Sequence, residues 1–162
     1  MLLILFLFGL ALGAVSASDD HQVRVQPGNS VWQSFNGRYY KYVATQMTWA
    51  DAELNCVSEG ANLVSIHSLE EEDFVKSLTK NVDHEVKARS WIGLSDVHKE
   101  GSWMWSDGSA VDFDIWSPGQ PDNARGNEHC VHINYVNDLK WNDIPCSMTR
   151  TSICASHITS PQ

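Results

Sequence analysis

The sequence has few basic residues. Lys and Arg together number 11 against 20 Asp and Glu, which leaves a formal net charge of −9 at pH 7. Proteins that bind nucleic acid need basic patches to neutralise phosphates, so this balance argues against that function. Clustered carboxylates repel one another, and a bound cation relieves that repulsion. The composition is therefore compatible with cation binding and predicts no nucleic-acid partner.

Long apolar runs are also scarce. One covers residues 1–17 and ends in Val15-Ser16-Ala17, which fits a small-residue cleavage site. It is short for a membrane span of about 20 residues, and Asp19 and Asp20 follow it at once. We therefore expect a signal peptide and a secreted, extracellular protein. No second long apolar run follows, so we expect no membrane insertion.

Catalytic signatures are missing. The sequence contains no Gly-x-Ser-x-Gly nucleophile motif and no His-Glu-x-x-His zinc motif. His67, His129 and His132, with acidic residues nearby, are side chains from which a hydrolase is built, but without a nucleophile motif we expect no enzyme. A zinc site at His129 and His132 is disfavoured because Cys130 between them is expected to form a disulfide.

Cysteine is limited to four residues: Cys56, Cys130, Cys146 and Cys154. An even number in a secreted chain indicates two disulfides. Four cysteines permit three pairings, and the sequence alone does not choose among them. None is left for an interchain bridge, so any homo-oligomer is expected to be non-covalent.

Two capping boxes predict where helices begin. Thr48 with Asp51 and Ser68 with Glu71 have the spacing in which the first side chain caps the helix and the acid reaches back. We expect the first helix to stop at Gly60 and the second near residue 81. The acidic run over residues 70–73 is explained by the preference of a helix N-terminus for negative charge, without a metal site. The apolar helix faces are Trp49, Ala52 and Cys56, then Phe74, Val75 and Leu78.

Strand signals occupy much of the rest. Asn36-Gly37 between β-prone runs predicts a hairpin over residues 35–43. Alternation in Cys130–Tyr135 predicts a half-buried strand. The fold class is therefore α+β, as one domain over residues 31–158 between a short flexible segment, 18–30, and a tail, 159–162. Further strands are expected at residues 62–66, 91–94, 103–105 and 152–155.

A loop-like stretch from Trp116 to Cys146 carries the chemistry. Three of its carboxylates and two of its amides suit Ca²⁺, which takes six to eight oxygen ligands, better than zinc, which prefers imidazole or thiolate. Pro121 fixes φ, and a cis bond before it would aim its two neighbours at the same point. The alternative is an acidic loop closed by a disulfide, without metal. The candidate ligands are Gln120, Asp122, Glu128, Asn142 and Asp143.

The order of these motifs resembles the C-type lectin domain over residues 32–156. Residues 60–71 are similar to small secreted fish lectins and to fish type II antifreeze proteins built on the same domain. The resemblance implies two helices flanking antiparallel sheets, a long irregular loop over residues 116–127, and the disulfides Cys56–Cys154 and Cys130–Cys146. The motifs are Trp91-Ile92-Gly93-Leu94, Gln120-Pro121-Asp122, Glu128, Trp141-Asn142-Asp143 and the four cysteines.

The resemblance also implies a function. In this family the five candidate ligands hold one Ca²⁺, which binds two vicinal hydroxyls of a sugar, and Gln-Pro-Asp implies galactose- or lactose-type specificity. Many galactose binders place Trp where this chain has Ala124. The expected partners are galactose-type glycans on microbial or cell surfaces, bound in innate defence, in mucus or serum. The alternatives are an ice-binding protein on the same fold and a calcium-independent lectin.

A second, weak calcium site is implied at Asp96, Glu100 and Asn123. Asn123 stands where Asp is frequent in the family, and His129 replaces an acidic residue after Glu128. We therefore expect Asp96 and Glu100 to be solvated loop charges.

Overall fold

The computed structural model describes residues 31–79 and 88–156. The expected signal peptide, the segment 18–30 and the tail 159–162 lie outside these residues, so the domain bounds stay a prediction. No helix in the described part of the chain is long and apolar enough to cross a membrane.

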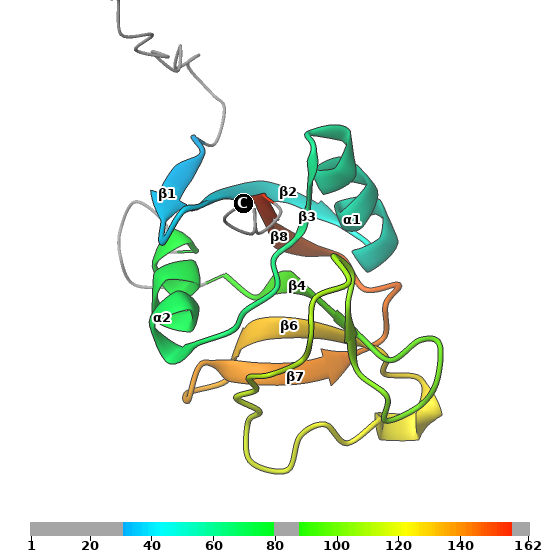
Figure 1. Cartoon of the computed structure of the whole chain (residues 1–162). Helices are drawn as coiled ribbons and strands as arrows, with labels where there is room; N and C mark the ends of the chain where they lie inside the picture. Colours follow the sequence, from blue (N-terminus) through cyan, green and yellow to red (C-terminus); the bar gives the residue numbers. More distant parts are fainter. Residues whose placement is uncertain (1–30, 80–87, 157–162) are drawn as a thin grey trace, which may run out of the picture.

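The described residues form a mixed α+β domain, as predicted (Figure 1). The main sheet runs in the order β1-β2-β8-β4-β6-β7, while β3 pairs with β8 and β5 with β4. The helices α1 and α2 lie on opposite sides of the sheet in Figure 1. The elements are β1 (Gln33–Phe35), β2 (Arg38–Met47), α1 (Trp49–Ser58), β3 (Ala61–Leu63), α2 (Leu69–Leu78), β4 (Ser90–Ser95), β5 (Met104–Trp105), the 3₁₀ turn η1 (Ala124–Gly126), β6 (Cys130–Tyr135), β7 (Lys140–Ile144) and β8 (Arg150–Ser156).

One strand pair departs from the antiparallel prediction. β4 and β8 are parallel, with Ser90 opposite Thr151 and Trp91 opposite Ser152. β8 follows the β6–β7 hairpin along the chain but inserts between β2 and β4. β8 is antiparallel to β2 on one side and parallel to β4 on the other. Side-chain periodicity carries no information on such a pairing.

The helices begin where the capping boxes predict. Thr48 Oγ1 accepts the Asp51 N–H at 3.3 Å, and Ser68 Oγ accepts the Glu71 N–H at 3.2 Å. The Asp51 carboxylate accepts the Thr48 hydroxyl at 2.6 Å. α1 ends at Ser58, just before Gly60 with a positive φ of 75°. α2 ends at Leu78, somewhat earlier than predicted.

The predicted hairpin is confirmed. Phe35 pairs with Arg38 across Asn36-Gly37, whose φ values of 46° and 79° are those of a type I′ turn. The strand predicted at residues 62–66 is β3, which is shorter and ends at Leu63. β6 has the predicted bounds but is buried on both faces at its first five residues, so the half-buried prediction is wrong. Val131 and Ile133 pack in one core cluster and Cys130 in the other, so side chains of either orientation are covered.

The acidic run of α2 has a structural role beyond its helix terminus. Glu71 is buried against Arg38, with Nη1 and Oε1 2.7 Å apart. The Glu72 side chain is fully buried and accepts a hydrogen bond from Trp141 Nε1 at 3.0 Å. The explanation by helix-terminus preference alone is therefore incomplete, because two of these carboxylates point into the protein.

Both implied disulfides are present. Cys56–Cys154 joins α1 to β8 across a sequence separation of 98 residues. Cys130–Cys146 closes a separation of 16 residues and links the start of β6 to the segment after β7. The second bond brackets the β6–β7 strand pair, in which β7 carries the candidate ligands Asn142 and Asp143. A third candidate, Glu128, lies two residues before the first cysteine of this bond.

Candidate metal centre

The loop that carries the site is anchored on a buried tryptophan. The Trp141 side chain is fully buried, and its backbone forms an isolated parallel β-bridge with Trp116. The Trp141 carbonyl oxygen accepts a hydrogen bond from the Ser117 N–H at 2.9 Å. The Trp116 ring lies 4.9 Å from the Trp103 ring and 5.9 Å from the Trp141 ring, centroid to centroid. Trp116 therefore anchors the loop, and the chain then turns toward the candidate ligands.

Three candidate carboxylates converge. Asp122, Glu128 and Asp143 each offer an oxygen atom, and these atoms lie within 4.8 Å of one another. Asp143 is fully buried, and its two oxygens accept the backbone N–H groups of Asp122 at 3.2 Å and Asn123 at 2.9 Å. The loop is thus folded around the Asp143 carboxylate by its own backbone.

The loop also closes on itself at Glu128. The Glu128 carboxylate accepts the Ala124 N–H at 3.0 Å, and the Glu128 N–H donates to the Asn123 side chain at 3.0 Å. Partial burial, with the Asp122 and Asp143 carboxylates nearby, raises the pKa of Glu128 above its ordinary value. Three carboxylates this close repel one another, which is the condition that a cation relieves.

The two candidate amides have unpaired oxygens. Gln120 Oε1 and Asn142 Oδ1 are both buried, and neither has a hydrogen-bond partner among the described residues. A buried acceptor without a partner costs about 1–3 kcal/mol. The Gln120–Pro121 bond is cis, as the sequence allowed. Asn142 Nδ2 lies 3.4 Å from His132 Nε2.

These donors fit Ca²⁺. Each amide lies within two residues of a carboxylate of the cluster, Gln120 two residues before Asp122 and Asn142 directly before Asp143. Hard oxygen donors with net negative charge are what Ca²⁺ selects, and the two unpaired carbonyl oxygens are the atoms that coordination would satisfy. His132 is the nearby nitrogen ligand type, but its Nδ1 is bonded to Ile133 O and its Nε2 faces the Asn142 amide nitrogen at 3.4 Å.

A second cluster differs from its prediction. Asp96 is 1% exposed, so the expectation that it is a solvated charge is wrong. Its carboxylate accepts the Gly101 N–H at 2.7 Å and lies 3.0 Å from His129 Nδ1, while the exposed Glu100 lies 3.4 Å from the same nitrogen. Asn123 bonds within the main loop instead. The group is Asp96, Glu100 and His129, and a weak second calcium site here stays a prediction.

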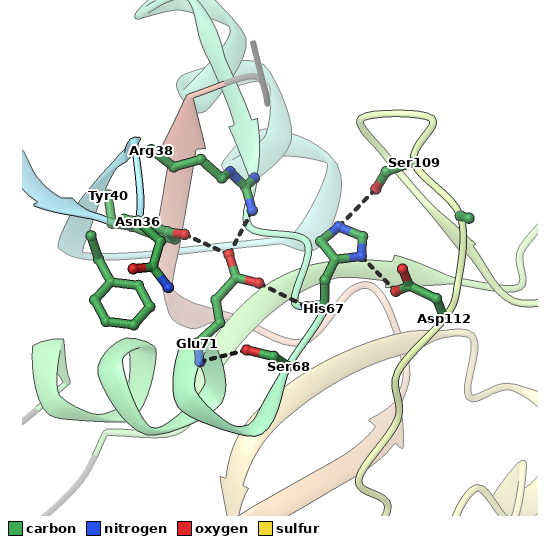
Figure 2. Close-up of a pocket in the computed structure, with 10 residues that line it drawn as sticks. Asn36, Arg38, Tyr40, His67, Ser68, Glu71, Ser109 and Asp112 are labelled. Atoms are coloured by element: carbon green, nitrogen blue, oxygen red, sulfur yellow. Dashed lines mark hydrogen bonds and ion pairs between the residues drawn. The ribbon is translucent and has the colours of Figure 1, made fainter. Parts of the chain in front are cut away.

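A separate hollow of about 410 Å³ lies between the β1–β2 hairpin, the start of α2 and residues 109–112 (Figure 2). In it His67 Nδ1 is 2.7 Å from Asp112, and its Nε2 is 3.2 Å from Ser109 Oγ. These contacts connect a serine, a histidine and an aspartate as in a Ser-His-Asp triad, although the sequence contains no motif that predicts one. However, the Ser109 hydroxyl donates to Asp107 at 2.5 Å. Its proton is thus directed away from His67, and the nucleophile is not activated.

The floor of this hollow is a structural network. The Glu71 carboxylate accepts hydrogen bonds from the Tyr40 hydroxyl at 2.5 Å, from Arg38 Nη1 at 2.7 Å and from the backbone N–H of His67 at 2.7 Å (Figure 2). Burial, with Glu71 beside it, raises the pKa of Tyr40. The Glu71 contacts to Arg38 and Tyr40 hold the start of α2 to the β1–β2 hairpin.

The chain is similar to known proteins in both sequence and structure. Residues 45–156 match the family described as the Lectin C-type domain. The chain is 47% identical over 127 residues to the lactose-binding lectin l-2 of Anguilla japonica, covering 76% of this chain and 74% of the relative. It is 42% identical over 128 residues to the type-2 ice-structuring protein of Osmerus mordax, covering 79% and 70%. The herring type II antifreeze structure superposes with a TM-score of 0.72 at 41% identity, covering 83% of this chain and all of that one.

Proposed function

Because the chain belongs to the C-type lectin domain family, we propose that it is a secreted, calcium-dependent lectin for galactose-type sugars. The observation that carries the proposal is the candidate metal centre itself. Asp122, Glu128 and Asp143 converge within 4.8 Å, and Gln120 and Asn142 add buried carbonyl oxygens that lack partners among the described residues. Such a donor set has the oxygen ligands and the negative charge that Ca²⁺ selects.

The protein's own side chains do two things in this proposal. Asp122, Glu128 and Asp143 supply the charge that retains the ion, while the backbone N–H groups that hold Asp143 fix its orientation. When bound, Ca²⁺ supplies a hard cation on which two sugar hydroxyls replace water. The outer lone pairs and N–H groups of the same residues then accept and donate hydrogen bonds to those hydroxyls.

Specificity follows from the order of donors around Pro121. Gln120 presents an amide, which donates and accepts, whereas Asp122 presents a carboxylate, which only accepts. In the family this amide-then-acid order accompanies galactose-type ligands. Ala124 is exposed and residues 124–127 contain no aromatic, so the apolar face of the sugar lacks a stacking partner there. We therefore expect a modest galactose preference.

Retention on a lactose column tests the proposal. The full chain is expected to bind in Ca²⁺ and to elute with a chelator. Gln120→Glu combined with Asp122→Asn leaves the total charge unchanged, so calcium affinity should survive while preference moves toward mannose-type sugars. Asp143→Ala removes a buried ligand and should abolish both. Retention that persists in chelator would show a calcium-independent lectin and overturn the proposal.

Ala124→Trp examines the missing stacking partner. An added ring beside the sugar should strengthen galactose binding by about 0.5–1.5 kcal/mol, by analogy with aromatic pairs. Ala124→Leu, which adds apolar bulk without a ring, is the matched control. Equal gains from both variants would show that stacking is not the cause.

Defence against microbes requires multivalency. One monosaccharide site binds weakly, and linked sites raise the apparent affinity without new contacts. We propose a non-covalent homo-oligomer that binds galactose-type glycans on microbial surfaces. Sedimentation of the purified protein and calcium-dependent agglutination of bacteria, inhibited by free lactose, test this step. A monomer that does not agglutinate would contradict it.

Ice binding is a second candidate, supported by the likeness to the ice-structuring protein and the herring antifreeze structure. Thermal hysteresis in the absence of sugar separates the two functions. A measurable hysteresis together with no lactose retention would favour the second candidate.

A further inference from the structure

Two arginines lie together at the junction of β4 and β8. Arg150 is the first residue of β8, and Arg89 directly precedes β4, whose Ser90 is in register with Thr151. The chain carries a net charge of −9, yet no ion pair joins either guanidinium to a carboxylate within residues 31–79 and 88–156. Two positive side chains therefore lie together in a chain whose net charge is negative.

The two arginines line a hollow of about 290 Å³, bounded also by Gln46, Ala88, Thr149 and Thr151, and none of these described lining residues is acidic. An irregularity in β2 accompanies it. Val43 pairs with Ser152 and Met47 with Arg150, so three residues of β2 stand opposite the single Thr151 of β8. Bulges of this kind re-aim side chains and leave backbone groups unpaired. One water occupies about 30 Å³ in the liquid, so the space accepts a tetrahedral oxyanion with several waters.

The guanidinium groups are held in place while keeping donors available. Arg150 Nη1 donates to Thr149 O at 2.8 Å, but its Nε is buried without a hydrogen-bond partner in the described part of the chain. The Arg89 guanidinium lies 5.7 Å from the centroid of the Tyr135 ring, which orients it. A buried N–H of a charged group without an acceptor is costly. An anion in the hollow would supply the missing acceptor for the Arg150 Nε–H group.

The electrostatics agree with this geometry. Partial burial, with Arg89 close by, lowers the pKa of Arg150. Like charges held near each other are stabilised by an anion between them. Planar guanidinium forks match the paired oxygens of sulfate and phosphate.

We propose that this arginine hollow binds a tetrahedral oxyanion, the sulfate or phosphate ester group of an acidic glycan. The site is separate from the metal centre. Arg89 contacts Tyr135, the last residue of β6, whereas Glu128 precedes the first residue of that strand. A glycan that carries both a galactose-type residue and an ester group would have a contact at each end of β6.

Titration of the full chain with inorganic sulfate and with inorganic phosphate tests the proposal, in calcium-free buffer with ionic strength held constant by chloride. We expect saturable binding with one site per chain. Arg150→Gln and Arg89→Gln should each weaken it by about tenfold or more, since each removes a charge-assisted hydrogen bond to the anion. Lys99→Gln, at an exposed lysine outside the hollow, makes the same change of charge and should have no effect.

Two further arms sharpen the result. A sulfated and a phosphorylated monosaccharide, compared at equal concentration, identify which ester is the better ligand. Lactose retention should be unchanged in both arginine variants, which separates this site from the metal centre and verifies the fold. If Arg150→Gln fails to fold, Arg89→Gln, at an exposed side chain, decides. No saturation with either anion, or an equal loss in Lys99→Gln, would overturn the proposal.

Discussion

Single buried carboxylates in this protein differ in how their charge is compensated. Glu71 is matched by the Arg38 guanidinium. The Glu72 carboxylate lies 2.9 Å from Lys76 Nζ, close enough for an ion pair, although this oxygen is not aligned for a hydrogen bond. The described residues that contact Asp143 offer only backbone N–H groups. At the residue scale, the first two carboxylates are structural, and the third is the one suited to an added cation.

Glu72→Gln should change how stability depends on pH. Burial raises the pKa of Glu72 although Lys76 and the Trp141 N–H oppose the shift. The folded protein then binds this proton more tightly than the unfolded chain. The contribution is fully present below the unfolded pKa, about 4.3, and is lost as pH rises through the folded pKa.

The free energy of unfolding, wild type minus Glu72→Gln, is therefore expected to fall above pH 4 by at most about 1.4 kcal/mol per pH unit. The ion pair with Lys76 is already contained in the pKa of Glu72. The remaining difference between a neutral Glu and a Gln at this position adds a constant offset, so the slope carries the test. Urea unfolding followed by tryptophan fluorescence at a series of pH values measures it. Glu70→Gln, at an exposed acid of the same helix, is the control. A difference that stays flat or rises would refute the assignment.

At the scale of elements, two glycines serve different purposes. Gly37 closes the β1–β2 turn with φ of +79°, and an added Cβ would meet nothing within 4 Å. A Cβ on Gly93, in the middle of β4, would lie 2.7 Å from the Leu63 carbonyl oxygen and 2.8 Å from Ser106 Oγ. One position needs a backbone conformation, and the other needs space between packed strands.

Alanine at each glycine should therefore have unequal effects. Gly37→Ala is expected to cost about 1–2 kcal/mol, the penalty of a left-handed L-residue. Gly93→Ala should cost more, about 3 kcal/mol, because the backbone it meets cannot move aside without breaking the β4 contacts. Chemical denaturation of both variants measures the order. A larger loss from Gly37→Ala would contradict this account of the sheet.

The disulfide beside the loop belongs to the same scale. Replacing Cys130 and Cys146 together by Ser should reduce the free energy of unfolding by about 3 kcal/mol, against about 4.7 kcal/mol for the Cys56–Cys154 pair, since the cost grows with loop length. The shorter link also joins β6 to the segment after β7, so its loss should weaken calcium affinity. Calorimetric titration of each double variant with Ca²⁺ tests this. Equal affinities in the two would show that the link does not position the site.

For the whole molecule, charge and metal are expected to be coupled. A protein with a net charge of −9 that gathers three carboxylates at one point gains stability when a cation binds the folded state alone. At free calcium 100 times the dissociation constant, the gain is about 2.7 kcal/mol. Differential scanning calorimetry should show a higher midpoint in Ca²⁺ than in chelator. Asp143→Asn should lose the increase, while Asp114→Asn, at an exposed acid outside the cluster, should keep it. An increase that survives Asp143→Asn would place the ion elsewhere.

Local features of this protein were predictable from its sequence because they depend on neighbours in the chain. The caps at Thr48 and Ser68 and the Asn36-Gly37 turn are decided within four residues. The disulfide pairing came from the resemblance to a family, since residue counting left three pairings open. The metal-ligand types came from the side-chain chemistry of the loop, and their role as ligands remains a prediction.

Tertiary structure alone decided what depends on distant partners. The parallel pairing of β4 with β8, the burial of Asp96 beside His129 and the inward direction of Glu72 toward Trp141 join residues far apart in the sequence. So does the arginine hollow, because Arg89 and Arg150 meet only when β8 inserts beside β4. Composition and periodicity describe the chain one segment at a time, whereas burial and charge pairing arise from segments that the fold brings together.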